Sequence, residues 1–314
     1  MKKILTFLVW STCNLYFTQQ NHEFSITWAY GLAGGSKPTT TKIEKENAIT
    51  EKQANDLIKY FLEDSNLDFK CIYNGCQNRA MVMSLLLNKK GIKHHKIWNF
   101  DPYKISIFNK QDGLDVEDIL KLKRNRIVWD FHVAISVLIK TEGTENLQNM
   151  VIDPSFASKP LTVSDWLALQ NSPNSYYTYI DPSWYNFVTL QPGTQFTCNG
   201  ETTDLNIPSC FSYLLTGDFY RYDNSKQKLM AEELATNAMI TRVADQIISK
   251  INMNDPSRSK IISLISDNFK SFQDLLSGKI SLDTTHPFYI HTKNYRSEYQ
   301  KSIEYWTREL QKMN

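Results

Sequence analysis

The sequence predicts an α+β protein in which a region of mixed helices and strands is followed by a helical C-terminal subdomain. A helical apolar pattern begins at Cys76 directly after a turn, and the β-branched stretch 127–139 alternates as a strand does. From residue 225 onward, apolar residues recur at helical spacing. We therefore expect two parts, residues 50–224 and residues 225–314.

The turn before the first of these helices delivers Cys76 to a helix N-terminus. Residues 73–75 end in the turn dipeptide Asn-Gly, and apolar residues then follow one helical face as far as Gly91. Unpaired backbone N–H groups and the positive end of the helix dipole favour a thiolate there and can face a developing oxyanion. The alternative is a small apolar residue packed under the helix, as most buried cysteines are. This stretch alone does not decide between a nucleophile and a packing residue.

The composition is that of an ordinary globular protein. Its 314 residues are 41% hydrophobic and 22% charged, with a formal net charge of +2, so the chain can bury a sizeable core. The sequence shows no basic stripe with interleaved aromatic residues, which argues against a nucleic-acid partner. Tyrosine and tryptophan crowd the segment 166–222, which fits an extended surface for a polymeric substrate or simply a tyrosine-rich β-region.

Residues 1–20 have the pattern of a secretory signal peptide. Lys2 and Lys3 precede an apolar run that is too short to span a membrane. Residues 21–49 are polar and are interpreted as a leader or linker. We expect a secreted or periplasmic protein with no integral membrane segment after leader removal. Cys13 is a weak candidate for lipid attachment, because Trp10 stands where a small aliphatic residue is usual.

Four cysteines lie beyond Cys13, and an even number favours disulfides in an oxidising compartment. Cys198 and Cys210 flank a polar loop, and we predict that they close it as a disulfide. Cys71 and Cys76 form the alternative pair, and a bond between them would block a nucleophile at Cys76.

Two further side chains are candidates for acid–base chemistry. His132 lies in the middle of the strand predicted at 127–139, on the face opposite to Trp129. A short strand at 149–152 is expected to form a hairpin with it, and it ends at Asp153, where a carboxylate can orient an imidazole. Taken alone, the pattern around His132 is more often that of a satisfied core histidine, and Asp153 alone would be a turn residue before proline.

The other predicted elements show no cluster that suggests chemistry. His94 and His95 are adjacent on a strand, so they point to opposite faces, cannot jointly hold a metal, and are interpreted as surface residues. Residues 101–125 are expected to form a charged, irregular insertion with one short helix at 116–122. The C-terminal part is expected to hold three amphipathic helices, one of which carries Ile261 to Phe272.

Three local strings resemble the signature segments of bacterial protein-glutaminases, secreted enzymes that deamidate glutamine side chains in intact proteins. The strings are Asn74-Gly75-Cys76-x-x-Arg79-Ala80, Val128-Trp129-x-Phe131-His132-Val133-Ala134 and Ile152-Asp153-Pro154-Ser155. Asp165-Trp166 is also similar to that family. The likeness runs from about residue 50 to about residue 224.

The resemblance implies a papain/transglutaminase-like core, in which a helix bearing the cysteine packs on an antiparallel sheet bearing the histidine and the aspartate. It implies Cys76 as the nucleophile, His132 as the base and Asp153 as the partner that orients the imidazole. The insertion at 101–125 and the helical tail depart from the family pattern. They leave the substrate preference open, and a partner on the C-terminal helices is one role for the tail.

The spacing of these residues argues independently against an ordinary papain-type peptidase. His132 follows Cys76 by 56 positions, whereas papain-like peptidases place the histidine roughly 130 or more positions downstream. The resemblance implies hydrolysis of exposed glutamine in protein substrates, with release of ammonia through a thioester and with no metal or organic cofactor. The alternatives are a transglutaminase or a cysteine peptidase with the same triad, or a secreted non-catalytic binding protein or effector.

Overall fold

The structure, a computed structural model, describes residues 22–23, 38–101, 113–122, 126–141, 143, 145–189, 195–198, 201–204 and 217–313. The predicted signal peptide, Cys13 and Cys210 lie outside these residues. The elements in chain order are β1 (His22–Glu23), η1 (Lys45–Asn47), β2 (Ile49–Thr50), α2 (Glu51–Glu63), α3 (Cys76–Lys89), β3 (His95–Phe100), β4 (Leu114–Glu117), β5 (Arg126–Trp129), β6 (Phe131–Lys140), β7 (Leu147–Ile152), β8 (Leu161–Thr162), α5 (Val163–Ala168), β9 (Tyr176–Ile180), β10 (Trp184–Thr189), β11 (Gln195–Cys198), β12 (Glu201–Asp204), β13 (Gly217–Arg221), η3 (Asn224–Lys226), α6 (Gln227–Gln246), η4 (Ile248–Lys250), α7 (Pro256–Ser266), α8 (Phe269–Leu276) and α9 (Tyr289–Met313).

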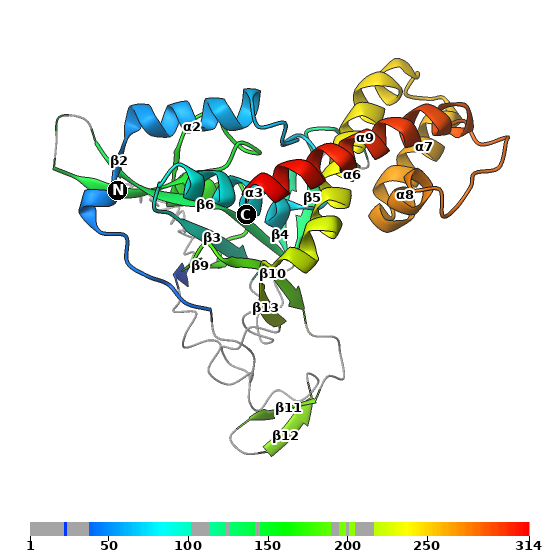
Figure 1. Cartoon of the computed structure of the whole chain (residues 1–314). Coiled ribbons are helices and arrows are strands. Elements are labelled where there is room, and N and C mark those ends of the chain that lie inside the picture. The colour runs from blue at the N-terminus through cyan, green and yellow to red at the C-terminus, as the bar shows by residue number, and fades with distance from the viewer. Residues whose placement is uncertain are drawn as a thin grey trace, which may run out of the picture.

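A largely antiparallel sheet forms the centre of the described part of the molecule (Figure 1). Its strand order is β1-β9-β3-β6-β7-β8, and β2 pairs with β6. Only β1 with β9 and β2 with β6 run parallel. The predicted hairpin is confirmed, because β7 pairs antiparallel with β6 and Ile152 lies opposite Ile135. The mixture of helices and antiparallel strands expected for an α+β protein is therefore confirmed.

Helices cover both faces of β6. On one face, α2 and α3 share a core cluster with Ile135, Val137 and Ile139. On the other face, Trp166 and Leu167 of α5 pack with neighbouring positions of the sheet, such as Ala134. Because α3 also contacts α6 and α9, it is buried over almost its whole circumference between residues 78 and 87. The helix that begins at Cys76 is thus held from several sides.

The strand predicted at 127–139 is two strands, and they belong to different sheets. β5 pairs with β4, whereas β6 pairs with β3 and β7, and the change of sheet occurs at Asp130. The break shifts the alternation of side chains, so Trp129 is not on the far side from His132. It also makes His132 the second residue of β6 instead of a central one.

Two other predictions are wrong. Residues 116–122 are not a helix: Val116 pairs with Ile127 in a β-ladder, and the Asp118 carboxylate accepts the backbone N–H groups of Leu120 and Leu122, which stabilises a turn. His94 and His95 are buried, not exposed. The imidazole of His94 hydrogen-bonds the Ser84 hydroxyl at 2.8 Å, and Nε2 of His95 hydrogen-bonds the backbone carbonyl of Thr41.

The segment before α2 lies against the sheet. The backbone N–H and hydroxyl of Thr41 donate to the Asp181 carboxylate, and the Asp181 backbone N–H donates to the carbonyl of Thr39. This segment covers His95 and explains its burial. The polar sequence of the segment gave no sign that it would lie there. Thr39 and Thr41 are thus bonded to the sheet, and the proposed role of residues 21–49 as a leader or linker stays a prediction.

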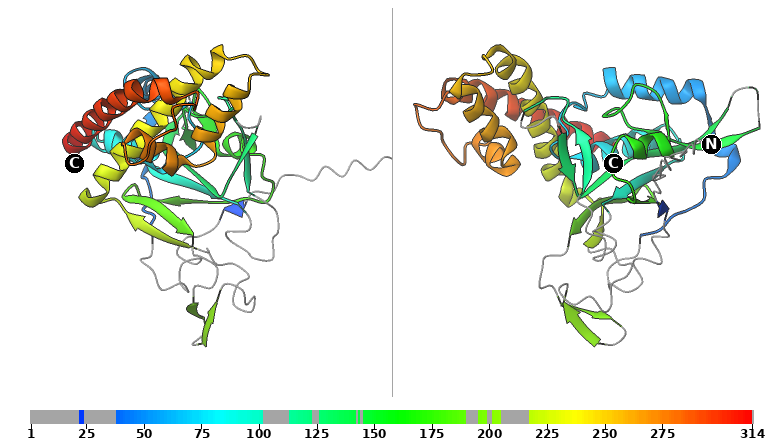
Figure 2. Two further views of the ribbon diagram at one scale, coloured as in Figure 1. Left: turned by 90° about the vertical axis from the view of Figure 1, so that its right-hand side faces the viewer. Right: turned by 180° about the vertical axis from the view of Figure 1, so that it is seen from behind.

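The C-terminal part is helical, as predicted, and two of its helices reach the central core (Figures 1 and 2). Met230 and Leu234 of α6 and Trp306 and Leu310 of α9 belong to the same core cluster as α3. The helix predicted through Ile261 to Phe272 is divided into α7 and α8, because Asn268 caps the second helix by accepting the Ser271 N–H. No helix among the described residues is long and apolar enough to cross a membrane. The predicted domain boundary at residue 224 stays a prediction.

Trp306→Ala should destabilise the whole described fold, because Trp306 is 2% exposed and packs in the cluster that contains α3. We expect a loss of about 3–5 kcal/mol in the free energy of unfolding, with a single urea transition by fluorescence and by circular dichroism. Lys301→Ala, an exposed change on the same helix, is the control and should be nearly neutral. Two separate transitions would show that residues 225–314 unfold as an independent domain.

Candidate active site

The backbone at Gly75 sets where α3 begins. Gly75 has φ +86°, a left-handed conformation that disfavours residues with a Cβ atom. The first intrahelical bond runs from the Arg79 N–H to the Gly75 carbonyl at 3.0 Å, which makes Cys76 the first helical residue. The predicted placement of Cys76 at a helix N-terminus is confirmed. Cys71 and Cys76 are both free thiols, so the alternative in which they pair does not hold.

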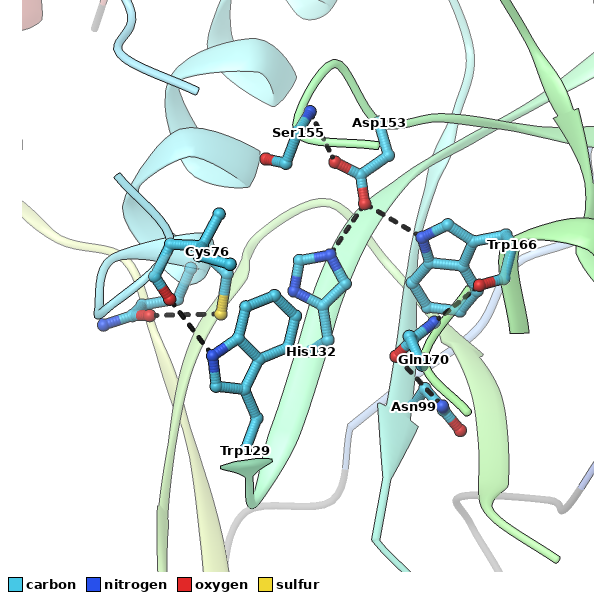
Figure 3. Close-up of polar contacts among 10 residues, drawn as sticks. Cys76, Asn99, Trp129, His132, Asp153, Ser155, Trp166 and Gln170 are labelled. Atoms are coloured by element: carbon cyan, nitrogen blue, oxygen red, sulfur yellow. Dashed lines mark hydrogen bonds and ion pairs between the residues drawn. The ribbon is translucent and has the colours of Figure 1, made fainter. Parts of the chain in front are cut away.

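His132 and Asp153 form a buried hydrogen-bonded pair next to the start of α3 (Figure 3). Nε2 of His132 lies 2.7 Å from Oδ2 of Asp153, and the two residues are only 1% and 5% exposed. His132 comes from β6, and Asp153 directly follows β7, so the antiparallel pairing of these strands brings them together.

The Asp153 carboxylate accepts three hydrogen bonds. Oδ2 accepts from His132 and from the Trp166 indole N–H at 2.9 Å, and Oδ1 accepts from the Ser155 backbone N–H at 3.1 Å. Burial by itself raises the pKa of Asp153, but the His132 charge and the hydrogen bonds from His132 and Trp166 outweigh it and hold the pKa below its usual range. Asp153 therefore stays ionised near neutral pH.

The other nitrogen of His132 faces the cysteine. In Figure 3, Nδ1 lies on the side of the ring toward the Cys76 sulfur, and it has no well-aligned hydrogen-bond partner among the described residues. Burial lowers the pKa of His132, but Asp153 and the Cys76 side chain more than offset this and raise it to about 9. His132 is therefore an imidazolium at neutral pH.

Three aromatic rings enclose the imidazole. The Trp129 ring stacks on it at a centroid distance of 4.6 Å, Trp166 lies at 5.7 Å, and Phe156 packs edge-on at 5.2 Å. The Trp129 indole N–H donates to the Ile72 carbonyl at 3.0 Å, which ties β5 to the loop before Cys76. These rings fix the plane of the imidazole and keep water from it. The resemblance named Trp129 and Trp166 from the sequence, but nothing there pointed to Phe156.

A pair of amide side chains holds α5 in place behind the site (Figure 3). Asn99 lies opposite His132 in the ladder between β3 and β6 and donates to Oε1 of Gln170 at 3.0 Å. Gln170 in turn donates to the Trp166 carbonyl at 3.0 Å. Nothing in the local sequence indicated this link, because Asn99 lies 71 positions before Gln170 in the chain.

Cys76 opens into a cleft of about 470 Å³. Its walls are residues 72–77, residues 128–131, and Asn186 and Phe187 of β10. The Cys76 thiol donates to Oε1 of Gln77 at 3.5 Å, so one carboxamide already lies within reach of the sulfur. Cys76 is half-buried while His132 and Asp153 are buried. The cleft therefore exposes the sulfur and shields the charge pair behind it.

No group of three His, Cys, Asp or Glu side chains in the described ranges could hold a metal ion. Cys198 ends β11, but its predicted partner Cys210 lies outside the described residues, so that disulfide stays a prediction.

A comparison with protein families finds a match, which covers the part of the chain that holds the site. Residues 41–170 match a family model described as Glutaminase, a span that includes Cys76, His132 and Asp153. The resemblance to protein-glutaminases predicted from the three strings is thus confirmed over this span. A search of curated proteins found no match.

Protein-glutaminases are also among the solved structures that the chain resembles. A crystal structure of a mutant pro-protein-glutaminase is 20% identical, with a TM-score of 0.39, over 68% of this chain and 64% of that one. The NMR structure of protein-glutaminase from Chryseobacterium proteolyticum is 19% identical, with a TM-score of 0.38, over 64% of this chain and 90% of that one. The chain thus spans slightly less than two thirds of the first of these proteins.

Asp153→Asn should lower the pKa of His132 well below about 9, because the Asp153 charge is the largest influence that opposes burial and only the Cys76 side chain then remains to oppose it. Titration of the His132 ring by NMR measures this directly. Asp165→Asn, which removes an exposed carboxylate next to Trp166, is the control and should leave the pKa in place. An unchanged His132 pKa in Asp153→Asn would contradict the assignment of the pair.

The raised pKa of His132 also makes the stability of the fold depend on pH. The folded pKa of His132 lies above that of an unfolded histidine, so its contribution to stability is present below about pH 6.5 and is lost as the pH rises through about 9.

Gly75→Ala should destabilise the protein more than Gly91→Ala does. Both glycines have positive φ, so each substitution strains the backbone by about 1–2 kcal/mol. A Cβ at Gly75 would also lie 3.0 Å from Nδ2 of Asn237, whereas a Cβ at Gly91 meets nothing within 4 Å. Thermal unfolding of the two variants measures the difference. Equal losses would mean that the contact with Asn237 costs nothing.

Proposed function

We propose that this protein hydrolyses the side-chain amide of protein-bound glutamine to glutamate and releases ammonia, through a thioester on Cys76. The single observation that carries the proposal is the arrangement of Cys76, His132 and Asp153 inside the span that matches the Glutaminase model. The match of residues 41–170 to that family model supports deamidation in general. The thioester and the role of each residue are argued from the geometry.

The first half of the reaction forms the thioester. The Cys76 thiolate attacks the carboxamide carbon, and backbone N–H groups at the start of α3 stabilise the resulting oxyanion. The His132 imidazolium then gives its Nδ1 proton to the departing nitrogen, which leaves as ammonia. The raised pKa of His132 ensures that this proton is present at neutral pH.

The second half hydrolyses the thioester. Neutral His132 takes a proton from water as it attacks the acyl carbon, and Cys76 leaves as the thiolate, so the product is glutamate and the imidazolium is restored. Asp153 binds Nε2 throughout, which keeps Nδ1 directed at the sulfur and stabilises the charge on the ring. The proton that His132 regains thus comes from the attacking water, and the new carboxylic acid loses its remaining proton to solvent to give glutamate.

The core around these residues fits the papain/transglutaminase-like architecture implied by the resemblance. α3 bears the cysteine and packs on β6, which bears the histidine, and the aspartate follows the neighbouring antiparallel strand. A transglutaminase or a cysteine peptidase would use the same groups. They differ in what attacks the thioester and in which bond is broken, so product analysis distinguishes them.

The test uses the full chain and a glutamine-containing substrate protein, with and without excess primary amine. Ammonia should appear, the substrate should gain about one mass unit per event, and its chain should remain whole. Incorporation of the amine in preference to water would indicate a transglutaminase, and new peptide termini a peptidase. Absence of all three products with every substrate would favour a binding protein.

Cys76→Ala and His132→Gln should each lower ammonia release by at least ~10³-fold, because the nucleophile and its proton donor act as a unit. His291→Gln is the matched control, since His291 lies on α9 and not in the walls of the cleft. Activity of Cys76→Ala comparable to that of the control would remove Cys76 from the mechanism.

A further inference from the structure

The loop that precedes Cys76 is held by a residue from the C-terminal helices. Nδ2 of Asn237, on α6, donates to the Asn74 carbonyl at 2.6 Å and lies 3.5 Å from the Cys71 carbonyl. Asn237 is 2% exposed, so water does not replace these bonds. Because both acceptors are carbonyl oxygens, only the amide nitrogen of Asn237 can face them, and its orientation is fixed.

The same two carbonyls receive a second buried donor from α3. Nη1 of Arg79 lies 2.8 Å from the Cys71 carbonyl and 3.2 Å from the Asn74 carbonyl. Arg79 belongs to the same local string as Cys76, whereas Asn237 follows Cys76 by 161 positions. The backbone carbonyls of the loop before Cys76 thus accept hydrogen bonds from two sides, from Arg79 of α3 and from Asn237 of α6.

The glycine at the turn allows this approach. Nδ2 of Asn237 would lie 3.0 Å from a Cβ at Gly75, closer than side chains normally pack. The absence of a side chain at Gly75 therefore lets α6 contact the backbone directly before Cys76.

One turn earlier, α6 contacts the first turn of α3. The Glu233 carboxylate accepts from Nδ2 of Asn78 at 2.6 Å, and Oδ1 of Asn78 accepts from the Tyr185 hydroxyl. Glu233 and Asn237 are four residues apart, so they lie on one face of α6. That face therefore meets both the loop before Cys76 and the residues just after it.

We propose that Asn237 is a positioning residue for Cys76, and that α6 is part of the scaffold of the active site. The effect on catalysis rests on the proposed function, but the effect on the reactivity of the Cys76 thiol does not. Without Asn237, the Asn74 peptide loses its shorter hydrogen bond and can rotate, which displaces the first residue of α3. A displacement of about 1 Å at a reacting atom costs roughly 100-fold in rate.

The experiment compares Asn237→Asp, which keeps the shape but replaces the donor with an acceptor, and Asn237→Ser, which is too short to reach both carbonyls. Thr241→Val is the control, because Thr241 is buried one turn further along α6 and its hydroxyl has no partner among the described residues. For each full-length variant we measure kcat, KM, the melting temperature and the rate at which iodoacetamide alkylates Cys76.

In both Asn237 variants, kcat and the alkylation rate should fall roughly 10- to 100-fold at a temperature where the protein is folded, with KM nearly unchanged. Thr241→Val should match the wild type. A lower melting temperature with unchanged kcat and unchanged alkylation would overturn the proposal and leave Asn237 a purely structural role. Failure of both Asn237 variants to fold, while Thr241→Val folds, would also overturn it.

If the wild-type protein shows no deamidase activity, the proposed function fails and the alkylation rates still decide the role of Asn237. A drop in alkylation confined to the Asn237 variants would then support the positioning role alone.

Discussion

The buried pair formed by His132 and Asp153 depends on three parts of the chain, which are β6, the turn after β7 and α5. Removing two charges from water costs several kcal/mol per ion unless other polar groups replace the water. The Trp166 indole and the Ser155 backbone supply those groups, so α5 and the turn after β7 must be placed together with β6. The surrounding aromatic rings then keep the pair dry, which strengthens the attraction between its charges.

Short-range patterns placed Cys76 at a helix start and Asp153 beside the His132 strand, whereas the roles of the three residues came from the resemblance. Cys76 lies at a helix start because an Asn-Gly turn and an apolar helical face adjoin it, and Asp153 follows a strand that forms a hairpin with the His132 strand. Both features depend on residues within about 25 positions of each other, so a single sequence carries the signal. The mixed helix and sheet architecture could be predicted for the same reason.

Features that depend on distant parts of the chain could not be predicted. The break at Asp130 is a change of sheet, and alternation along the strand cannot reveal which partner each half pairs with. The burial of His95 comes from a polar segment that lies over it, and the local strand pattern around His95 does not reveal that segment. Asn237 has no pattern around it that marks it out, since its role depends on two carbonyls in a loop far upstream.

The separation of 161 residues between Cys76 and Asn237 has a consequence for protein synthesis. Ribosomes add roughly 5–20 residues per second, so about 8–30 s pass between the synthesis of Cys76 and that of Asn237. During that interval the nascent chain already contains Cys76 but lacks the Asn237 contact with the preceding loop. The proposed site is thus completed only late in translation, after most of the sequence has been made.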